Sequence, residues 1–537
     1  MKTNLLKTIT AVILLLVPNV NFGQAPTLGT AANFVLFTTS GAVSNTGITH
    51  LTGDVGTNSG SITGFGNVNG IMQNSNGATA QCAADLLIAY NQLNSAIPTF
   101  FPAPLLGNGQ ILTPGVHAIS APTTLNLDLT LNAGGNSNAV FIIQIQGAFS
   151  AGANSEVKLI NGARASNVFW KVEGLVSMAS GCTMKGTIIA NNAAINMNNG
   201  DSLEGRALST AGAITVDGVL GYIPVVLGSP MLTGPAAPVL AATECYALFS
   251  ANGPVTNAGI TYATGDIGTN VGLTTGYDPL LVNGNIHPIP DVSTGQAAAS
   301  LLNVYSYLNT VPHDIELLYP AQFGRNLVLT PHTYLLNAAT VFTDSLYLDG
   351  RNNANAVFII KINGALTTST YAKVLLINGT QAKNVFWKVE GAVNINDYSE
   401  FKGTIVANNG AIDLKTGVTL AGRALSTAGA LNTFAMTATA IMPTAGCAAL
   451  GTASYNENKI SIYPNPFTTS INIMINDASQ INNAELSIYD VFGREIMKTT
   501  ITKEITTLET STLSSGIYLY KVTSENKTIQ SGKLISK

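Results

Sequence analysis

The chain of 537 residues is too long for one ordinary domain, and only 10% of its residues are charged, well below the usual share. Its net charge of -4 leaves no basic stripe for a phosphate backbone and no Lys or Arg cluster for an anionic membrane, which argues against nucleic acid as a partner. Plentiful Gly, Ala, Asn, Ser and Thr instead predict a β-rich protein with a neutral surface.

The first residues have the pattern of an export signal. Two lysines precede an apolar run from Ala11 to Val17, and small residues follow it. This pattern predicts a secretory signal peptide over residues 1–23, removed before Gln24. A membrane anchor is the alternative, but the run is too short to cross a bilayer and no later segment qualifies. We therefore expect an exported protein without a membrane span.

Two long blocks of the chain repeat each other. The segment NAVFIIQIQGAF at Asn138 returns as NAVFIIKINGAL at Asn355, and NVFWKVEG, KGTI and GRALSTAG keep the same offset of 217 residues. Upstream, NTGITHLTGDVGTN at Asn45 is matched by NAGITYATGDIGTN at Asn257. A fixed period indicates one structural unit used twice, so we predict two modules of about 215 residues. Two copies of one surface favour a binding function.

We expect module 1 over residues 25–222 and module 2 over residues 244–440, joined by a Pro-, Gly- and Ala-rich linker at 223–243. Each module holds one segment, 79–96 or 294–309, in which Leu, Ile and Tyr recur at helical spacing. These helices are expected to pack against a sheet rather than to act as recognition helices. The remainder of each module predicts short strands separated by turn residues.

The last third of each module carries a finer repeat of about 19 to 27 residues. Its lines, such as GAFSAGANSEV and GLVSMASGCTM, alternate large apolar with small polar residues, as half-buried strands do. A short strand recurring in this way, with Gly or Asn at the corners, indicates a β-solenoid. The large apolar residues form a predicted inward rank in each module: Phe149, Val176, Ile195 and Ile214, and Leu366, Val393, Ile412 and Leu431.

The residues that follow this rank are expected to point outward. They are Ser150, Ser177, Asn196 and Thr215 in module 1, and Thr367, Asn394, Asp413 and Asn432 in module 2. Stacked strands lie about 4.8 Å apart, so these residues predict a regular row of small polar groups on a flat face. The row could simply solvate an outer sheet. However, Lys and Glu, the usual residues for that purpose, are absent from it, which favours a regular ligand.

The residues that an enzyme would need are missing. The acids that recur in both copies are Asp54 and Asp266, in Gly-flanked turns, and Glu173 and Glu390, each two residues from a Lys. We expect turn hydrogen bonds for the first pair and local ion pairs for the second, not paired catalytic acids.

The other candidate groups point the same way. The recurring Arg206 and Arg423 are predicted to be buried hydrogen-bond donors. No nucleophile or phosphate-loop motif occurs. The five histidines lack metal-ligand spacing: His50, His117, His287, His313 and His332. We expect no enzyme, no cofactor and no metal.

Four cysteines, Cys82, Cys182, Cys245 and Cys447, are compatible with disulfides after export. Cys245 and Cys447 bracket module 2, so a bridge between them would join its ends. Buried free thiols are the equally open alternative.

An ordered series of motifs resembles the ice-binding (antifreeze) protein family of cold-adapted bacteria, fungi and algae. The motifs run from LGTAANFVLFTTSGAVSNTGITHLTGDVGTN through LTPGVHAI, NAVFIIQI and VKLINGARASNVFWKVEG to GTIIANNAAINMNNGDSLEGRALSTAGAIT, and they cover both modules. The resemblance implies a mainly β fold: right-handed, discontinuous β-solenoids of triangular cross-section, each with one long helix alongside. It also implies a flat face bearing Thr, Ser, Asn and Ala that adsorbs to ice and inhibits its growth or recrystallisation.

A short pattern associated with that face, Thr-(Ala/Gly)-x-(Thr/Asn), occurs at 46–49 and at 416–419. The candidate ice-binding residues are therefore Thr46, Thr49, Ser150, Ser177, Asn196, Thr215, Thr367, Asn394, Thr416, Thr419 and Asn432. Module 2 departs from the pattern with Asn257-Ala258, with Asp413 in its row and with Lys415 beside it. Charges fit ordered ice poorly, so we expect module 2 to bind more weakly or through other positions. The main alternative function is a cell-surface adhesin that holds carbohydrate or other cells through the same faces, and a third is a purely structural surface protein.

The tail is a separate region. After a linker at 441–455, residues 456–537 hold nearly a third of all charged residues. The motifs IYPNPF, LSIYDVFGRE, GIYLYKV and GKLI resemble the C-terminal sorting domain of the type IX secretion system of Bacteroidota. This implies a small β-sandwich, read by the export machinery and removed during secretion or surface attachment; an extra immunoglobulin-like binding domain is the alternative. We expect a monomer that is secreted or held on the outer cell surface.

Overall fold

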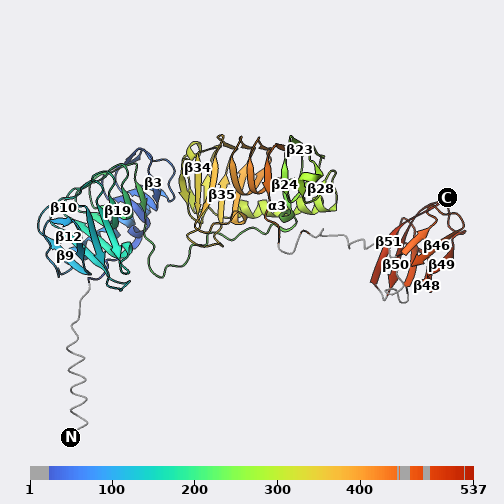
Figure 1. Ribbon diagram of the computed structural model, residues 1–537, viewed down its shortest axis with the longest axis horizontal. Coiled ribbons are helices and arrows are strands. Elements are labelled where there is room, and N and C mark those ends of the chain that lie inside the picture. The colour runs from blue at the N-terminus through green and yellow to red at the C-terminus, as the bar shows by residue number, and fades with distance from the viewer. Residues whose placement is uncertain (1–22, 444–446, 448–459, 476–483, 525–526) are drawn as a thin grey trace, which may run out of the picture. The chain divides into compact units, whose positions relative to one another are not determined.

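The computed structural model describes residues 23–443, 447, 460–475, 484–524 and 527–537 (Figure 1). The predicted signal peptide at 1–23 lies outside these residues except for Gly23, as does most of the predicted linker at 441–455. The chain divides into two compact units, Met1–Cys447 with both modules and Ala448–Lys537 with the tail.

Module 1 is a stack of coils whose strands pair in parallel. One wall is an eight-stranded sheet that stands alone, and a larger sheet of thirteen strands bends around the other two sides. The eight-stranded sheet has the order β5 (Ile62–Thr63), β2 (Val43–Thr46), β20 (Ile214–Asp217), β18 (Ile195–Met197), β16 (Val176–Met178), β13 (Phe149–Ala151), β10 (Thr123–Asn126) and β7 (Leu105–Gly107).

The larger sheet turns a corner within its two longest strands. Glycines stand at these bends because the backbones nearly touch: a Cβ on Gly205 would lie 1.8 Å from the carbonyl oxygen of Gly186. The main path is β6 (Met72–Asn74), β4 (Asp54–Thr57), β1 (Phe34–Thr38), β19 (Ser202–Ser209), β17 (Thr183–Ala190), β14 (Glu156–Ile160), β11 (Asp128–Asn132) and β8 (Gln110–Leu112). Pairing with it are β15 (Val168–Val172), β12 (Phe141–Ile145), β9 (Gly115–Ile119), β21 (Leu220–Tyr222) and β3 (His50–Thr52).

The solenoid is discontinuous in sequence. The early strand β2 lies between β5 and the late strand β20, and β1 lies between β4 and β19. Arg206 secures this insertion, since its Nε donates to the carbonyl oxygen of Ala32 at 2.9 Å and its Nη1 to Thr187 Oγ1 at 3.2 Å. Arg423 likewise donates to the carbonyl oxygen of Glu244 in module 2. The prediction that both arginines are buried structural donors is confirmed.

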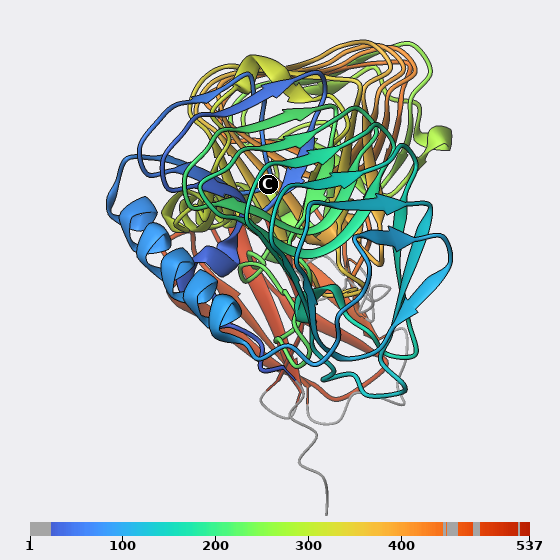
Figure 2. The same ribbon diagram turned by 90° about the vertical axis from the view of Figure 1, so that its left-hand side faces the viewer.

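Helix α2 (Gly77–Ser95) runs beside the coils (Figure 2). It begins at a capping box, in which Asn76 accepts from the N–H of Thr79 and Thr79 accepts from the N–H of Asn76. Its buried side, including Leu86 and Leu93, packs on apolar residues that point outward from the larger sheet, among them Phe169. The predicted helix at 79–96 is therefore present and serves packing.

The predicted inward ranks form the core. All eight residues, from Phe149 to Ile214 and from Leu366 to Leu431, have no exposed surface. Trp170 lies beside Phe149, with ring centroids 5.4 Å apart. Their burial stabilises each coil, at about 25 cal/mol per Å² of apolar surface removed from water.

Module 2 repeats this plan with α3 (Val292–Thr310) as its helix. Its eight-stranded sheet has the order β26 (Thr274–Thr275), β23 (Val255–Ala258), β43 (Leu431–Phe434), β41 (Ile412–Leu414), β39 (Val393–Ile395), β36 (Leu366–Thr368), β33 (Thr340–Thr343) and β30 (Phe323–Gly324). The main path of its fifteen-stranded sheet is β27 (Val282–Asn283), β24 (Tyr262–Thr264), β44 (Thr437–Thr439), β42 (Thr419–Ser426), β40 (Glu400–Asn408), β38 (Val385–Glu390), β35 (Phe358–Ile362), β32 (Thr333–Leu336) and β29 (Ile315–Glu316). Strands β22 (Tyr246–Ser250), β25 (Asp266–Thr269), β28 (Ile286–His287), β31 (Leu327–Leu329), β34 (Ser345–Asp349) and β37 (Lys373–Ile377) complete it.

The ends of module 2 are joined covalently. A disulfide links Cys245 and Cys447, with Cα atoms 5.5 Å apart, whereas Cys82 and Cys182 are buried free thiols. The sequence left disulfides and buried free thiols open, and the structure has both: one pair of cysteines forms a disulfide and the other two remain free.

Residues of the predicted linker contact module 2. The carbonyl oxygen of Thr233 accepts from the N–H of Val357 at 2.9 Å, and that of Ala236 accepts from the hydroxyl of Tyr307 at 2.7 Å.

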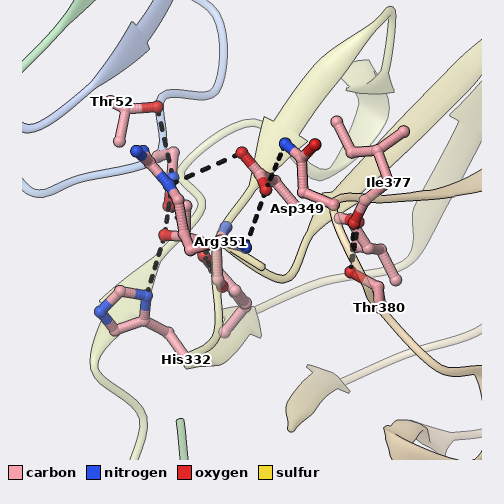
Figure 3. Close-up of polar contacts among 11 residues, drawn as sticks. Thr52, His332, Asp349, Arg351, Ile377 and Thr380 are labelled. Atoms are coloured by element: carbon pink, nitrogen blue, oxygen red, sulfur yellow. Dashed lines mark hydrogen bonds and ion pairs between the residues drawn. The ribbon is translucent and has the colours of Figure 1, made fainter. Parts of the chain in front are cut away.

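The two modules also share direct hydrogen bonds. Asn67 donates to the carbonyl oxygen of Tyr319 at 2.9 Å, and Asn69 donates to Thr330 at 2.9 Å and accepts from the hydroxyl of Tyr334 at 2.7 Å. A cleft of about 250 Å³ lies beside them. In it Arg351 faces Asp349, with Nε 3.6 Å from Oδ2 (Figure 3).

The tail forms two antiparallel sheets around its own core, which includes Phe467 and Leu486. One sheet has β45 (Ile460–Tyr463), β46 (Ser470–Ile475) and β49 (Ile505–Glu509). The other has β48 (Glu495–Ile501), β47 (Ala484–Tyr489), β50 (Gly516–Ser524) and β51 (Lys527–Ser536). The predicted small β-sandwich is confirmed.

Candidate functional site

Each module presents three outward faces, and they differ in chemistry. The helix face is the side of the larger sheet that the helix covers. The ion-pair face is the outward surface of the larger sheet beyond its corner. In module 1 it is formed by β8, β11, β14, β21, β3 and the first halves of β17 and β19. The row face is the outward surface of the eight-stranded sheet.

The ion-pair face is solvated by charged side chains. In module 1, Lys158 pairs with Asp128 at 2.5 Å and Lys185 with Glu204 at 3.0 Å. In module 2, Lys373 pairs with Glu400 at 2.7 Å. This is the usual way in which a sheet face stays soluble, and the helix face is already occupied. The row face is therefore the surface that remains open for a ligand.

The row face of module 1 carries an unbroken line of hydroxyl and amide side chains. In register across successive strands stand Thr63, Ser44, Thr215, Asn196, Ser177, Ser150 and Thr124. Some are fixed by their neighbours: the Thr215 hydroxyl donates to Asn196 Oδ1 at 2.6 Å, and the hydroxyl oxygens of Thr124 and Ser150 lie 3.3 Å apart. Strand pairing thus supplies the spacing and hydrogen bonds supply the orientation.

A second line of small residues runs beside this row. The carbonyl groups of Ala42, Ala213, Ala194, Leu175 and Ala148 accept backbone hydrogen bonds from successive strands of the sheet. Leu175 is the exception in size and is 43% exposed. In module 2 the same line is Pro254, Ala430, Ala411, Ala392 and Ala365. The row face of module 2 is therefore flatter at Ala392, the position that corresponds to Leu175.

The row of module 2 contains a charge. Its members are Thr275, Thr256, Asn432, Asp413, Asn394, Thr367 and Val341. Asp413 accepts from Asn432 at 2.8 Å and pairs with Lys415 at 3.0 Å, and the Lys415 ammonium lies 4.6 Å from the ring centroid of Phe434. The carboxylate is therefore internally balanced rather than free.

The structure brings eight of the eleven predicted site residues onto the row faces, including Thr46, and places Thr49, Thr416 and Thr419 elsewhere. Thr46 is exposed at the end of β2, beside the row and opposite Asp217. Thr49 lies in the following turn, where its hydroxyl donates to Asn45 at 2.5 Å.

Thr416 lies at a corner between β41 and β42, and Thr419 opens β42 opposite Glu400, on the ion-pair face of module 2. The short pattern at 416–419 therefore lies off the row face.

Six members of the rows were not predicted from the sequence: Ser44, Thr63, Thr124, Thr256, Thr275 and Val341. Ser44, Thr63, Thr256 and Thr275 belong to early strands that join the end of the row only through the long-range insertion of β2 and β23. Thr124 belongs to an alternating stretch, TTLNLDLTLN, whose period of two was the available signal.

The recurring glutamates hold the helix in place. Glu173 pairs with the buried Lys171 at 2.5 Å and accepts from Tyr90 at 2.6 Å and from Asn191 at 2.7 Å. Burial alone would raise the pKa of Glu173, but these hydrogen bonds lower it below its usual value. Such a carboxylate stays ionised and is unsuited to proton donation. Glu390 has the same partners in module 2: Lys388, Tyr305 and Asn408.

Asp54 and Asp266 do not make the turn hydrogen bonds that the sequence predicted. They begin strands β4 and β25 and accept backbone N–H groups of the neighbouring coil, from Ile71 at 2.9 Å and from Asn285 at 2.7 Å. They serve coil stacking instead of local turns. Within the described ranges, no three His, Cys, Asp or Glu side chains are grouped to hold a metal, and no helix is long and apolar enough to cross a membrane.

Comparison with known proteins agrees with this arrangement. The family model described as Ice-binding-like matches residues 37–219 and 249–441, which is most of both modules. The chain belongs to the ice-binding-like family. The model of the secretion system C-terminal sorting domain matches residues 461–537. The second unit is thus a sorting domain of the type IX system, which directs proteins to the cell surface or the medium.

Two relatives and one solved structure locate this member of the ice-binding-like family more closely. A chain named ice-binding protein from Nostoc sp. (strain HG1) is 37% identical over 194 residues, 35% of this chain and 71% of that one. An ice-binding protein from Flavobacterium frigoris (strain PS1) is 30% identical over 34% of this chain and 71% of its own length. The crystal structure of an ice binding protein from an Antarctic Flavobacteriaceae bacterium has 63% identity and a TM-score of 0.76, covering 79% of this chain and all of that one.

Proposed function

We propose that this protein adsorbs to ice through the row faces of its two modules and inhibits ice growth or recrystallisation. The observation that carries the proposal is the contrast between faces: one is covered by a helix, one is solvated by ion pairs, and the row face holds small side chains in register. Relatives named as ice-binding proteins support ice as the ligand.

The order of the row face explains how it would bind. A liquid-like surface would lose side-chain freedom when it docks on a crystal, which weakens binding. Here the strands set a repeat of about 4.8 Å, and hydrogen bonds such as Thr215 to Asn196 hold the side chains before contact. Water ordered over this surface docks on the crystal with little further loss of entropy. The adsorbed protein pins the ice front, and growth between pinned points becomes curved and unfavourable.

Two modules in one chain add avidity. When one row face is bound, the other is held near the same crystal, which raises its effective concentration without any new contact. We propose that a single chain acts as a monomer, since the tandem modules already provide two faces. Export through the sorting domain would bring them to the ice outside the cell.

The test is thermal hysteresis and ice-crystal shaping by residues 24–447, compared with each module alone. We expect activity in the tandem fragment that exceeds the activity of either module at the same module concentration. Absence of shaping in all three samples would reject ice as the ligand and favour adhesion to carbohydrate or to other cells.

A further inference from the structure

The sorting domain holds an aromatic side chain out in the solvent. Residues 490–494 connect β47 and β48, and Phe492 at this turn is 84% exposed, with Val491 at 63%. Asp490 Oδ1 accepts the N–H groups of Phe492 at 2.9 Å and of Arg494 at 3.0 Å, and Arg494 Nε donates to Asp490 Oδ2 at 2.7 Å. The turn is thus fixed by its own hydrogen bonds and keeps the phenyl ring in water.

Apolar residues continue from this turn onto the outward side of the four-stranded sheet. Leu519 on β50 stands opposite Tyr489 on β47, and Ile517 stands opposite Ile535 on β51. Leu519 and Ile517 are each about half exposed, and Ile496 on β48 is exposed beside the turn. We call Val491, Phe492, Ile496, Ile517 and Leu519 the apolar tip.

The other end of the same sheet side is polar. Glu485 and Lys498 form an ion pair there at 2.8 Å, and the exposed Lys521 stands opposite Ser487. The domain core does not need the tip, because Phe467, Leu486, Ile488 and Val522 are already fully buried on the inner side. Exposed apolar side chains therefore gather at the end next to the fixed turn, where the charged neighbours are Lys533, opposite Leu519, and Glu495, opposite Tyr489.

Scattered apolar residues are normal on protein surfaces, but exposed apolar residues gathered beside a preorganised aromatic are typical of a protein interface. The match to a secretion sorting domain supplies the partner, because such a domain must be held by the export machinery. We propose that the apolar tip is the surface by which this domain docks into an apolar pocket of a protein of the type IX secretion machinery. The proposal rests on the sorting-domain match and is independent of ice binding.

The test uses the full chain expressed in a host with an active type IX system. The double variant Phe492→Ser with Leu519→Ser should reduce the fraction of protein that reaches the surface or the medium by roughly tenfold or more, since central aromatic anchors dominate interfaces. Ile505→Ser is the matched control, because Ile505 is also about half exposed but lies on β49 in the other sheet. It should leave export unchanged.

Protease resistance of the retained full chain separates misfolding from lost docking, and its ice activity should equal that of the wild type. Export unaffected in the double variant, or reduced equally by Ile505→Ser, would overturn the proposal. A photoreactive phenylalanine analogue in place of Phe492 identifies the occupant directly. A cross-link to a protein of the secretion machinery is expected. A cross-link only to a second copy of this chain, to lipid or to nothing would refute the assignment.

Discussion

The two modules share an interior and differ on the surface. Their inward ranks are alike, apolar and fully buried, and the clusters around Glu173 and Glu390 have the same partners in both. On the row faces, module 1 has Leu175 in its alanine line, whereas module 2 has the Asp413–Lys415 pair in its row. Core packing constrains which residues can occupy the inward positions, whereas only the ligand constrains the residues on the row face. The row face is therefore where the sequences of the two modules can differ.

Module 2 also contains stabilising features that module 1 lacks. Its ends are closed by the Cys245–Cys447 disulfide. Its helix α3 begins at Asp291, a charged cap next to His287, where module 1 has Asn76 and Gln73. These differences make the stability of the two modules separable by redox state and by pH.

The largest difference in stability should follow from the disulfide. The bridge spans 202 residues, so Cys447→Ser should destabilise module 2 by about 2–5 kcal/mol, because the unfolded chain regains freedom. Calorimetry of residues 24–447 should show a lowered transition for module 2 and an unchanged one for module 1. A shift of both transitions would mean that the modules unfold as one unit.

The next effect concerns the row itself. Ser177→Tyr in isolated module 1 and Asn394→Tyr in isolated module 2 should each remove most of the thermal hysteresis, because a bulky ring lifts the flat face off the crystal. Circular dichroism should be unchanged, since both positions point outward. The control Thr130→Tyr places the same ring on the ion-pair face, where module 2 naturally carries Tyr347. Retained activity in Ser177→Tyr would remove this row from the site.

A smaller gain is expected from Leu175→Ala in module 1. This change gives the alanine line the form that it has in module 2, where Ala392 occupies the position. Ice-growth inhibition by isolated module 1 should increase while its melting temperature changes little, because Leu175 is partly exposed. Unchanged or weaker inhibition would show that the line beside the row does not meet ice.

The charged pair gives a test in module 2. Asp413→Asn combined with Lys415→Gln removes both charges and keeps hydrogen-bonding groups in place, so inhibition by module 2 should rise modestly. The result to compare is Asp413→Asn alone, which leaves Lys415 unpaired above Phe434 and should be less active than the double variant. Equal activity of wild type and both variants would show that the balanced pair is harmless to ice binding.

The smallest effect is a pH dependence confined to module 2. The Asp266 carboxylate, whose Oδ2 lies 3.8 Å from Nε2, and the hydrogen bond between Nδ1 and Asp291 Oδ2 at 2.6 Å raise the pKa of His287 above its ordinary 6.5. The stabilisation is therefore fully present below pH 6.5 and is lost as pH rises through the folded-state value. His287→Gln should lower the melting temperature of module 2 at pH 5.5 more than at pH 8.5. An equal effect at both values would mean that the charge on His287 contributes nothing.

Much of this arrangement was predictable because it is local. The inward ranks, the two helices and the lines of Ser177 and Asn394 follow from periods of two and 3.6 residues within short segments. The insertion of β2 next to β20 depends on pairing between segments more than 160 residues apart, so the sequence alone did not place Ser44 or Thr256 in the rows. Thr416 and Thr419 fit a short pattern, yet a corner turns them away from the row face.

The central claim is that ice is bound by the row faces and by no other face. Its most direct test is thermal hysteresis of residues 24–447 carrying Ser177→Tyr and Asn394→Tyr together, measured beside Thr130→Tyr. We predict near-complete loss of hysteresis and crystal shaping in the double variant and wild-type activity in the control. Wild-type activity in a folded double variant would contradict the account.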